Sequence, residues 1–166
     1  ISVSDNTATN MLITEIEGKN IKERKSDYDF KYINETIEEL DCEDTGLGYY
    51  VWYADSPRGV RNTTSVRDLN NFYERLYRNA YLGEEYDSKM IEIMSTVENR
   101  SKLPSQLPKD VVVAHKTGAI TAHEHDAGMI VGTENDFLIS VLTKNASNPY
   151  NTTGRIAKAA YEYFNK

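Results

Sequence analysis

The spacing of apolar residues changes once along this chain, near residue 110. Before that point, apolar side chains recur every three or four residues, which is the period of an amphipathic helix. Asp5 or Asn6, and Thr64 or Ser65, can cap two of these periodic stretches by accepting hydrogen bonds from the first turn. The sequence therefore predicts four helices, over residues 6–17, 29–40, 66–79 and 87–95.

After residue 110, short β-branched and apolar runs replace the helical period, as expected of strands. We expect three strands and one last helix, at residues 111–116, 127–132, 137–143 and from Asn151 or Thr152 onward. Helices followed by consecutive strands indicate an α+β fold: a helical part plus an antiparallel sheet with a C-terminal helix. Three strands make a thin sheet, so we expect that a piece of the fold is missing.

Two of the expected helices carry an apolar stripe, which in a globular protein usually faces the core. The stripe of the first helix consists of Ala8, Met11, Leu12 and Ile16. The stripe of the last helix consists of Ile156, Ala160, Tyr163 and Phe164. We predict that these are the buried sides of the two helices.

Composition excludes several classes of function. The 166 residues suffice for one domain, with a mostly helical part over 1–110 and three strands plus a helix over 111–166. A formal net charge of −7 argues against a nucleic-acid partner, because binding phosphates needs a basic surface. No apolar run reaches the ~20 residues of a membrane-spanning helix, and the one cysteine, Cys42, permits no internal disulfide.

Two short motifs stand at the ends of predicted elements. Lys116-Thr117-Gly118 stands at the end of the first predicted strand and places a cation and a hydroxyl at the edge of the sheet. Gly118 has no side chain, so a ligand backbone could lie alongside the strand there. Ser4-Asp5-Asn6 stands at the start of the first helix and offers a hydroxyl and an amide. Taken alone, each triplet is explained equally well as a strand-end turn or a helix cap.

Taken together, S-D-N followed by K-T-G resembles the motif set of class A β-lactamases and penicillin-binding proteins. Other stretches are similar to the same family in the same order: V-S-D-N-T-A-T-N-M-L, E-E-L-D-C-E-D-T-G-L, R-N-T-T-S-V-R-D-L, L-P-K-D-V-V-V-A-H-K-T-G and H-D-A-G-M-I-V. The resemblance covers essentially the whole chain and implies a partial β-lactamase/transpeptidase-like fold.

The resemblance implies catalytic roles for Ser4 and Lys116. Ser4 would bridge the general-base lysine and Lys116 and pass a proton to the leaving nitrogen. Lys116 would supply positive charge for a substrate carboxylate, which Thr117 would hydrogen-bond. Asn6 would hold a substrate amide, and the backbone N–H of Ala119 would be one of two oxyanion donors.

The nucleophilic serine of this family lies in an S-x-x-K motif well before S-D-N, and this chain contains no S-x-x-K. We therefore expect the chain to be the C-terminal part of the domain, inactive alone because it lacks the nucleophile. A sheet with an unpaired edge recruits other strands. As protein partners we accordingly expect the missing N-terminal segment or a second copy of the chain.

The chain departs from the family pattern at three positions. Alignment from either side puts Val51 or Tyr49 where β-lactamases carry the Glu that activates water for deacylation, and Asp55 is a nearby acid at the wrong spacing. Tyr49 and Asn62 stand near the positions of the Arg–Asp pair that ties down the same loop. His125-Asp126 occupies the strand that often carries an Arg for the substrate carboxylate. These departures argue against an efficient β-lactamase and favour a penicillin-binding-protein-like hydrolase or a domain that no longer turns over.

Two alternatives from other classes stay open. His123 and His125 would lie on one side of an extended segment with Asp126 adjacent, a partial set of metal ligands. No fourth ligand is visible in the sequence, so we expect no metal. The second alternative is a catalytically dead binding or scaffold domain, because a fold alone does not determine function.

The sequence thus favours part of a penicillin-recognising serine hydrolase that needs no cofactor. Its small-molecule partner would be a β-lactam or a D-Ala-D-Ala peptide of peptidoglycan. The resemblance implies a location in the bacterial cell envelope or outside the cell.

Overall fold

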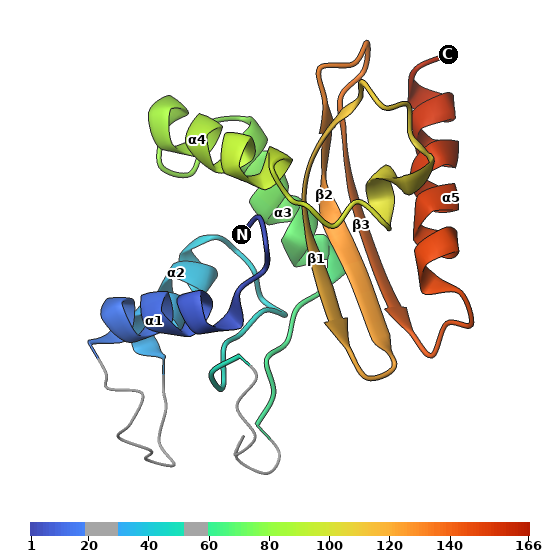
Figure 1. Cartoon of the computed structure of the whole chain (residues 1–166). Coiled ribbons are helices and arrows are strands. Elements are labelled where there is room, and N and C mark those ends of the chain that lie inside the picture. The colour runs from blue at the N-terminus through green and yellow to red at the C-terminus, as the bar shows by residue number, and fades with distance from the viewer. Residues whose placement is uncertain (19–29, 52–59) are drawn as a thin grey trace. The chain divides into compact units, whose positions relative to one another are not determined.

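The structure is a computed structural model that describes residues 1–18, 30–51 and 60–166. Its elements are α1 (Asn6–Glu17), α2 (Lys31–Glu39), α3 (Val66–Tyr77), α4 (Glu84–Ser95), the 3₁₀ helix η1 (Leu103–Gln106), β1 (Val112–Ile120), β2 (His123–Val131), β3 (Phe137–Lys144) and α5 (Pro149–Phe164) (Figure 1). The predicted α+β class is confirmed. The described residues group into two compact units, Asp5–Asn71 and Ile1–Ser4 with Phe72–Lys166. That the chain forms a single domain stays a prediction.

The unit Asp5–Asn71 is built on α1 and α2. Asp5 caps α1 by accepting a hydrogen bond from the Ala8 N–H at 2.7 Å, which decides between the two predicted caps. The apolar core of the unit contains Ile13, Phe30 and Tyr50, and the two aromatic rings meet edge to face with centroids 5.2 Å apart. Such edge-to-face contacts stabilise a core beyond the area that they bury.

The buried side of α1 is not the predicted one. Met11 and Leu12 are 68% and 65% exposed, whereas Asn10 and Glu17 are buried. Glu17 turns inward because its carboxylate accepts the Ile33 N–H at 2.8 Å, at the N-terminus of α2, where free N–H groups favour an anion. A polar contact therefore sets the orientation of this helix, and the apolar stripe lies on its exposed side.

Three asparagine side chains hold alternate residues of the segment that follows α2. Each side-chain amide accepts a hydrogen bond from the N–H of one loop residue and donates one to the C=O of the same residue, over distances of 2.8–3.0 Å. The pairs are Asn10 with Val51, Asn34 with Leu47, and Asn62 with Tyr49. These amide pairs anchor the loop through its backbone. The rest of the expected loop, with Asp55, lies outside the described residues.

Asp68 on α3 anchors the start of the same segment. Its side chain is 1% exposed and accepts hydrogen bonds from the Asp44 N–H at 2.7 Å and the Thr45 hydroxyl at 2.8 Å. Burial works to raise the pKa of Asp68, but hydrogen bonds from Thr45, Asp44 and Ser65 outweigh it and lower the pKa below its ordinary value. The folded protein therefore favours the ionised carboxylate.

We expect Asp68→Asn to destabilise the protein by about 1.5–3 kcal/mol, the usual range for hydrogen bonds to a charged group. Because its pKa is lowered on folding, Asp68 contributes stability above its unfolded pKa of about 3.9 and loses it as the pH falls through the folded value. Urea unfolding followed by circular dichroism measures both effects. A variant with unchanged stability at pH 7, or with the same acid sensitivity as the wild type, would contradict the prediction. Asp44→Asn, which alters an exposed side chain, is the control.

The second unit contains an antiparallel sheet in the order β1-β2-β3. η1 and α5 cover one face of this sheet, as Figure 1 shows for α5 along β3. The apolar core between them consists of Leu103, Leu107, Val111, Val113, Ile130, Phe137, Ile139, Val141 and Ala157. In the sheet, Gly128 lies opposite His115, and a side chain at Gly128 would overlap the backbone there. Glycine at this position lets the His115 side chain be buried.

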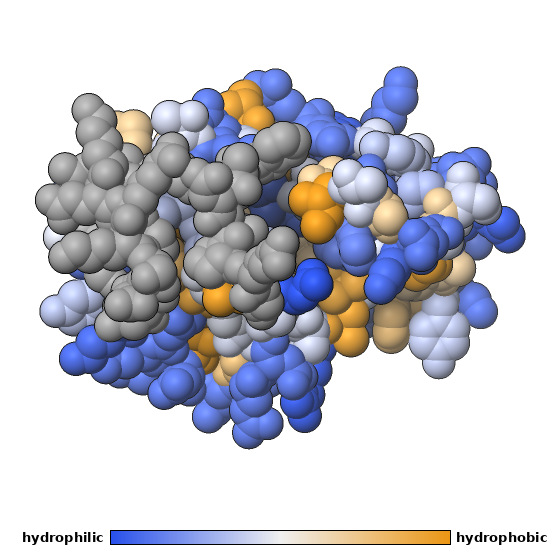
Figure 2. All heavy atoms as spheres, turned by 90° about the horizontal axis from the view of Figure 1, so that it is seen from below, coloured by the Kyte–Doolittle hydropathy of each residue, from blue (hydrophilic) through white to orange (hydrophobic). Residues whose placement is uncertain are grey.

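The predicted face of α5 is only partly correct: Ala160 packs against the core, and the Phe164 ring lies 5.2 Å from that of Phe137. Thr153, Gly154 and Ala157 are its buried residues, while Ile156 and Tyr163 are 43% and 69% exposed. The small residues face inward because η1 approaches the helix closely, and a Cβ at Gly154 would overlap the Ser105 side chain. Apolar side chains also reach the surface elsewhere, as orange areas among hydrophilic ones in Figure 2.

Candidate active site

Ser4 and Lys116 lie together in the unit that contains the sheet. The Lys116 ammonium donates a hydrogen bond to Ser4 Oγ at 2.7 Å, although the two residues are 112 positions apart in the sequence. It also donates to the Thr117 carbonyl oxygen at 2.6 Å. The structure therefore brings together the two residues for which the sequence predicts catalytic roles. The roles themselves stay predictions.

The backbone around Ser4 forms a tight turn. Ser4 has a positive φ of 55°, and its N–H donates to the Ile1 carbonyl oxygen at 3.0 Å. The Ser2 hydroxyl shares a hydrogen bond with Thr96, and the Ser2 carbonyl accepts the Glu98 N–H at 3.1 Å. A residue other than glycine keeps a left-handed conformation only where its surroundings enforce it, and such residues cluster at functional sites. This turn fixes the Ser4 hydroxyl at the Lys116 ammonium.

Lys116 is partly buried on β1. Burial lowers the pKa of Lys116 below its ordinary value, and the nearby cation Lys102 lowers it as well, whereas the carboxylate of Asp126 opposes them. A lysine with a lowered pKa gives up a proton more readily than a solvated one. The amine next to Ser4 is thus suited to exchange a proton with the serine hydroxyl.

The other predicted binding residues are divided between the two units. Thr117, Gly118 and Ala119 follow Lys116 on β1, and Ala119 is exposed at the end of the strand. Asn6 is the first residue of α1, in the unit Asp5–Asn71. The structure therefore groups Thr117, Gly118 and Ala119 with Ser4 and Lys116, and a part for Asn6 in the same site stays a prediction.

A buried His–Asp pair lies next to the K-T-G motif. His115 and Asp126 are both fully buried, and His115 Nδ1 lies 2.8 Å from Asp126 Oδ1. The Leu103 N–H donates to the second oxygen, Asp126 Oδ2, at 2.9 Å. A carboxylate only accepts hydrogen bonds, so Nδ1 is the donor. Asp126, which the metal hypothesis grouped with His123 and His125, is thus bound to another histidine.

Lys102 is a cation of the site that no sequence motif identifies. Its ammonium donates to the Gly118 carbonyl at 2.9 Å and to the His125 carbonyl at 2.8 Å, and it pairs with the Glu124 carboxylate at 2.8 Å. The hydrogen bond and charge of Lys102 lower the pKa of Glu124, against the effect of burial. A buried ammonium thus lies beside the last residue of K-T-G, in a strand pair without an arginine.

His123 and His125 lie side by side on β2, with ring centroids 6.0 Å apart. His125 Nδ1 accepts the Thr143 N–H at 3.1 Å, and His123 Nδ1 lies 3.0 Å from the Thr121 carbonyl oxygen. One nitrogen of each ring is therefore engaged within the protein. In the described ranges, no three His, Cys, Asp or Glu side chains are grouped in a way that could hold a metal ion.

We expect no tight zinc binding at His123 and His125, because two ring nitrogens without a third protein ligand make a weak site. Isothermal titration with zinc chloride measures this directly, with His123→Ala as the control variant. Stoichiometric binding that disappears in the variant would contradict the prediction.

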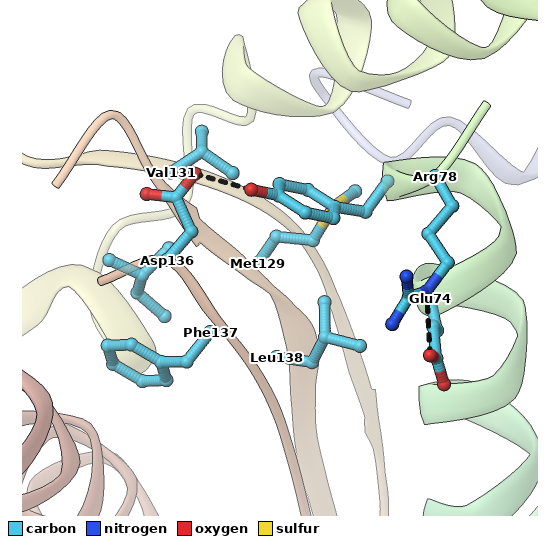
Figure 3. A pocket seen from close by; sticks show the side chains of 9 residues that line it. Glu74, Arg78, Met129, Val131, Asp136, Phe137 and Leu138 are labelled. Atoms are coloured by element: carbon cyan, nitrogen blue, oxygen red, sulfur yellow. Dashed lines mark hydrogen bonds and ion pairs between the residues drawn. The ribbon is translucent and has the colours of Figure 1, made fainter. Parts of the chain in front are cut away.

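A separate pocket of about 220 Å³ lies where α3 meets the far ends of β2 and β3. Figure 3 shows Met129 and Leu138 between two polar pairs. The Tyr77 hydroxyl donates to Asp136 at 3.0 Å, and Arg78 pairs with Glu74 at 2.8 Å. None of the residues predicted for the active site lines this pocket. The pocket is therefore not the substrate site that the motifs indicate.

In the part of the chain that the structure describes, no helix is long and apolar enough to span a bilayer.

The two positions predicted for the deacylation base, Val51 and Tyr49, lie on the loop that the asparagine side chains anchor. Their side chains are apolar and phenolic, and neither is a carboxylate. A general base at either position would need a different residue.

Comparison with known proteins supports the resemblance to β-lactamases and penicillin-binding proteins. The model of the Beta-lactamase enzyme family matches residues 1–164. Among solved structures, the chain is similar to a variant of PBP-A in an acyl-enzyme complex with penicillin G, with a TM-score of 0.81 and 26% identity over 99% of this chain and 58% of that one. It also resembles a β-lactamase from Sphaerobacter thermophilus, with a TM-score of 0.85 and 22% identity over 99% of this chain and 60% of that one. The chain thus spans about three fifths of the structures that it matches.

Proposed function

Because this chain belongs to the beta-lactamase enzyme family, we propose that it forms the Ser4–Lys116 side of a serine hydrolase site for β-lactams or D-Ala-D-Ala peptides. The observation that carries the proposal is the 2.7 Å hydrogen bond from the Lys116 ammonium to Ser4 Oγ. This contact joins the serine of S-D-N to the lysine of K-T-G. The location proposed for the protein is the bacterial envelope or the exterior of the cell.

Each residue of the site has one task in this proposal. When the nucleophile attacks the substrate carbonyl, the Ser4 hydroxyl passes a proton to the leaving nitrogen. Lys116 keeps that hydroxyl in place and attracts the substrate carboxylate, which the Thr117 hydroxyl binds. The Ala119 N–H stabilises the oxyanion. The nucleophile comes from outside these 166 residues, either from another segment of the same protein or from a second chain.

The test is the intact mass of the protein after exposure to benzylpenicillin. It requires a protein in which this chain is joined to an S-x-x-K segment. We expect the mass to rise by that of one penicillin molecule, and the rise to disappear when the serine of S-x-x-K is replaced by Ala. A protein that gains no mass and does not hydrolyse penicillin would support the scaffold alternative, which the absence of S-x-x-K from these 166 residues keeps open.

A further inference from the structure

We propose that Lys102 is a positioning residue of this site, which orients and polarises the peptide group between Gly118 and Ala119. The proposal rests on the proposed function, in which the Ala119 N–H is an oxyanion donor. Lys102 contacts the K-T-G motif at a backbone group. It acts through the carbonyl oxygen of Gly118, which its ammonium binds at 2.9 Å.

Three groups of the protein surround the Lys102 ammonium. It donates hydrogen bonds to the carbonyl oxygens of Gly118 and His125 at 2.9 and 2.8 Å, and it forms an ion pair with the carboxylate of Glu124 at 2.8 Å. Gly118 and His125 are register partners on β1 and β2. Lys102 therefore ties the two strands together at the position where K-T-G ends.

The side chain of Lys102 is held in place from a second direction. It is 1% exposed, and the ring of Tyr150, at the start of α5, lies 5.6 Å from its ammonium. The Tyr150 hydroxyl donates to the other oxygen of Glu124 at 3.2 Å. A buried charge is costly unless it is paired and hydrogen-bonded, and Lys102 has an ion pair and two hydrogen bonds. The arrangement thus leaves the ammonium little freedom to move.

The Gly118 carbonyl and the Ala119 N–H belong to the same peptide group. A trans peptide is planar, so its C=O and N–H point in opposite directions. When Lys102 fixes the direction of the oxygen, it also fixes the direction of the N–H. A cation on the oxygen draws electron density from the nitrogen, and hydrogen bonds in such a chain strengthen one another. Lys102 therefore prepares the Ala119 N–H to donate to a developing oxyanion.

The first test compares penicillin acylation rates in the protein that joins this chain to its S-x-x-K segment. The double variant Lys102→Met/Glu124→Gln removes the ammonium without leaving a buried charge unpaired, which protects the fold. We expect acylation to slow on the order of 10²-fold, as for other small misplacements of a reacting group, with the Kd for penicillin and the melting temperature little changed. Lys102→Arg keeps a cation at the carbonyl and should recover most of the rate. Lys109→Met, at an exposed lysine, should have no effect.

The second test is independent of activity. In nitrogen-15 NMR spectra of the same proteins, the double variant should move the amide proton of Ala119 upfield, because its peptide group is less polarised. The amide signals of Met129 and Ile139, farther along the sheet, should stay in place. An unchanged Ala119 signal, or an unchanged acylation rate in the double variant, would overturn the positioning role. If the wild type is not acylated at all, the proposed function fails, and the NMR result alone decides the role of Lys102.

Discussion

Replacing Val51 with Glu should speed release of the penicilloyl group by about 10²–10⁴-fold, the usual contribution of a positioned general base. In the protein that joins this chain to an S-x-x-K segment, no carboxylate stands at this position without the substitution, so we expect its acyl adduct to persist for minutes to hours. Asn10 binds both the N–H and the C=O of Val51, at 2.9 and 2.8 Å. The substitution changes neither of these groups, so the loop should keep its anchor.

The measurement is the decay of the penicilloyl adduct, followed by intact mass after excess penicillin is removed. Tyr49→Glu is the matched control, because the other alignment puts the base at that position. Faster release in Tyr49→Glu but not in Val51→Glu would mean that the second alignment is correct. Rapid hydrolysis by the wild type, without any adduct, would contradict the prediction and assign the base to another acid, such as Asp55.

The second large effect concerns the pair at the centre of the site. We expect Ser4→Ala and Lys116→Met each to slow acylation by about 10²–10⁴-fold, because each removes part of the proton transfer to the leaving nitrogen. The double variant should be little slower than the slower single variant, since residues that act as a unit are not additive. Stopped-flow acylation with a chromogenic cephalosporin measures all three rates. Independent effects that multiply would show that the 2.7 Å contact has no part in the reaction.

The same pair should determine how acylation depends on pH. A solvated lysine titrates at about 10.4, and burial lowers the pKa of Lys116. The cation is present below the pKa and is lost above it, so the alkaline decline of the rate should begin below the pH of an ordinary lysine. Replacing Lys116 with Met should remove this limb. An alkaline decline of the acylation rate that persists in Lys116→Met would be caused by another titrating group.

The sequence pointed to Ser4 and Lys116, which the structure brings together, but not to what surrounds them. Local signals identified the start of α1, whereas β1 does not end at Lys116 as predicted but continues through K-T-G to Ile120. Lys102 has no such signal. It precedes a short 3₁₀ helix, and only the tertiary structure brings it to the carbonyl oxygens of β1 and β2. Partners far apart in the sequence leave no trace in the local pattern.

The prediction of which side of the helix is buried failed for α1, and in part for α5, for a related reason. An apolar stripe indicates that a helix is amphipathic, but it does not identify the partner that the helix meets. On α1 the buried side is set by what Asn10 and Glu17 bind, and on α5 by the close approach of η1 to Gly154. Element type and order could therefore be predicted, whereas the faces of these two helices could not.

The three asparagine pairs have a consequence for how this loop can evolve. Asn10, Asn34 and Asn62 bind the peptide groups of Val51, Leu47 and Tyr49, so this anchoring does not depend on which side chains those three residues carry. A salt bridge between side chains would instead be lost when either partner mutates. Substitutions at the three anchored residues therefore leave the backbone conformation of the loop unchanged. New chemistry can arise there by single substitutions, without a compensating change elsewhere in the chain.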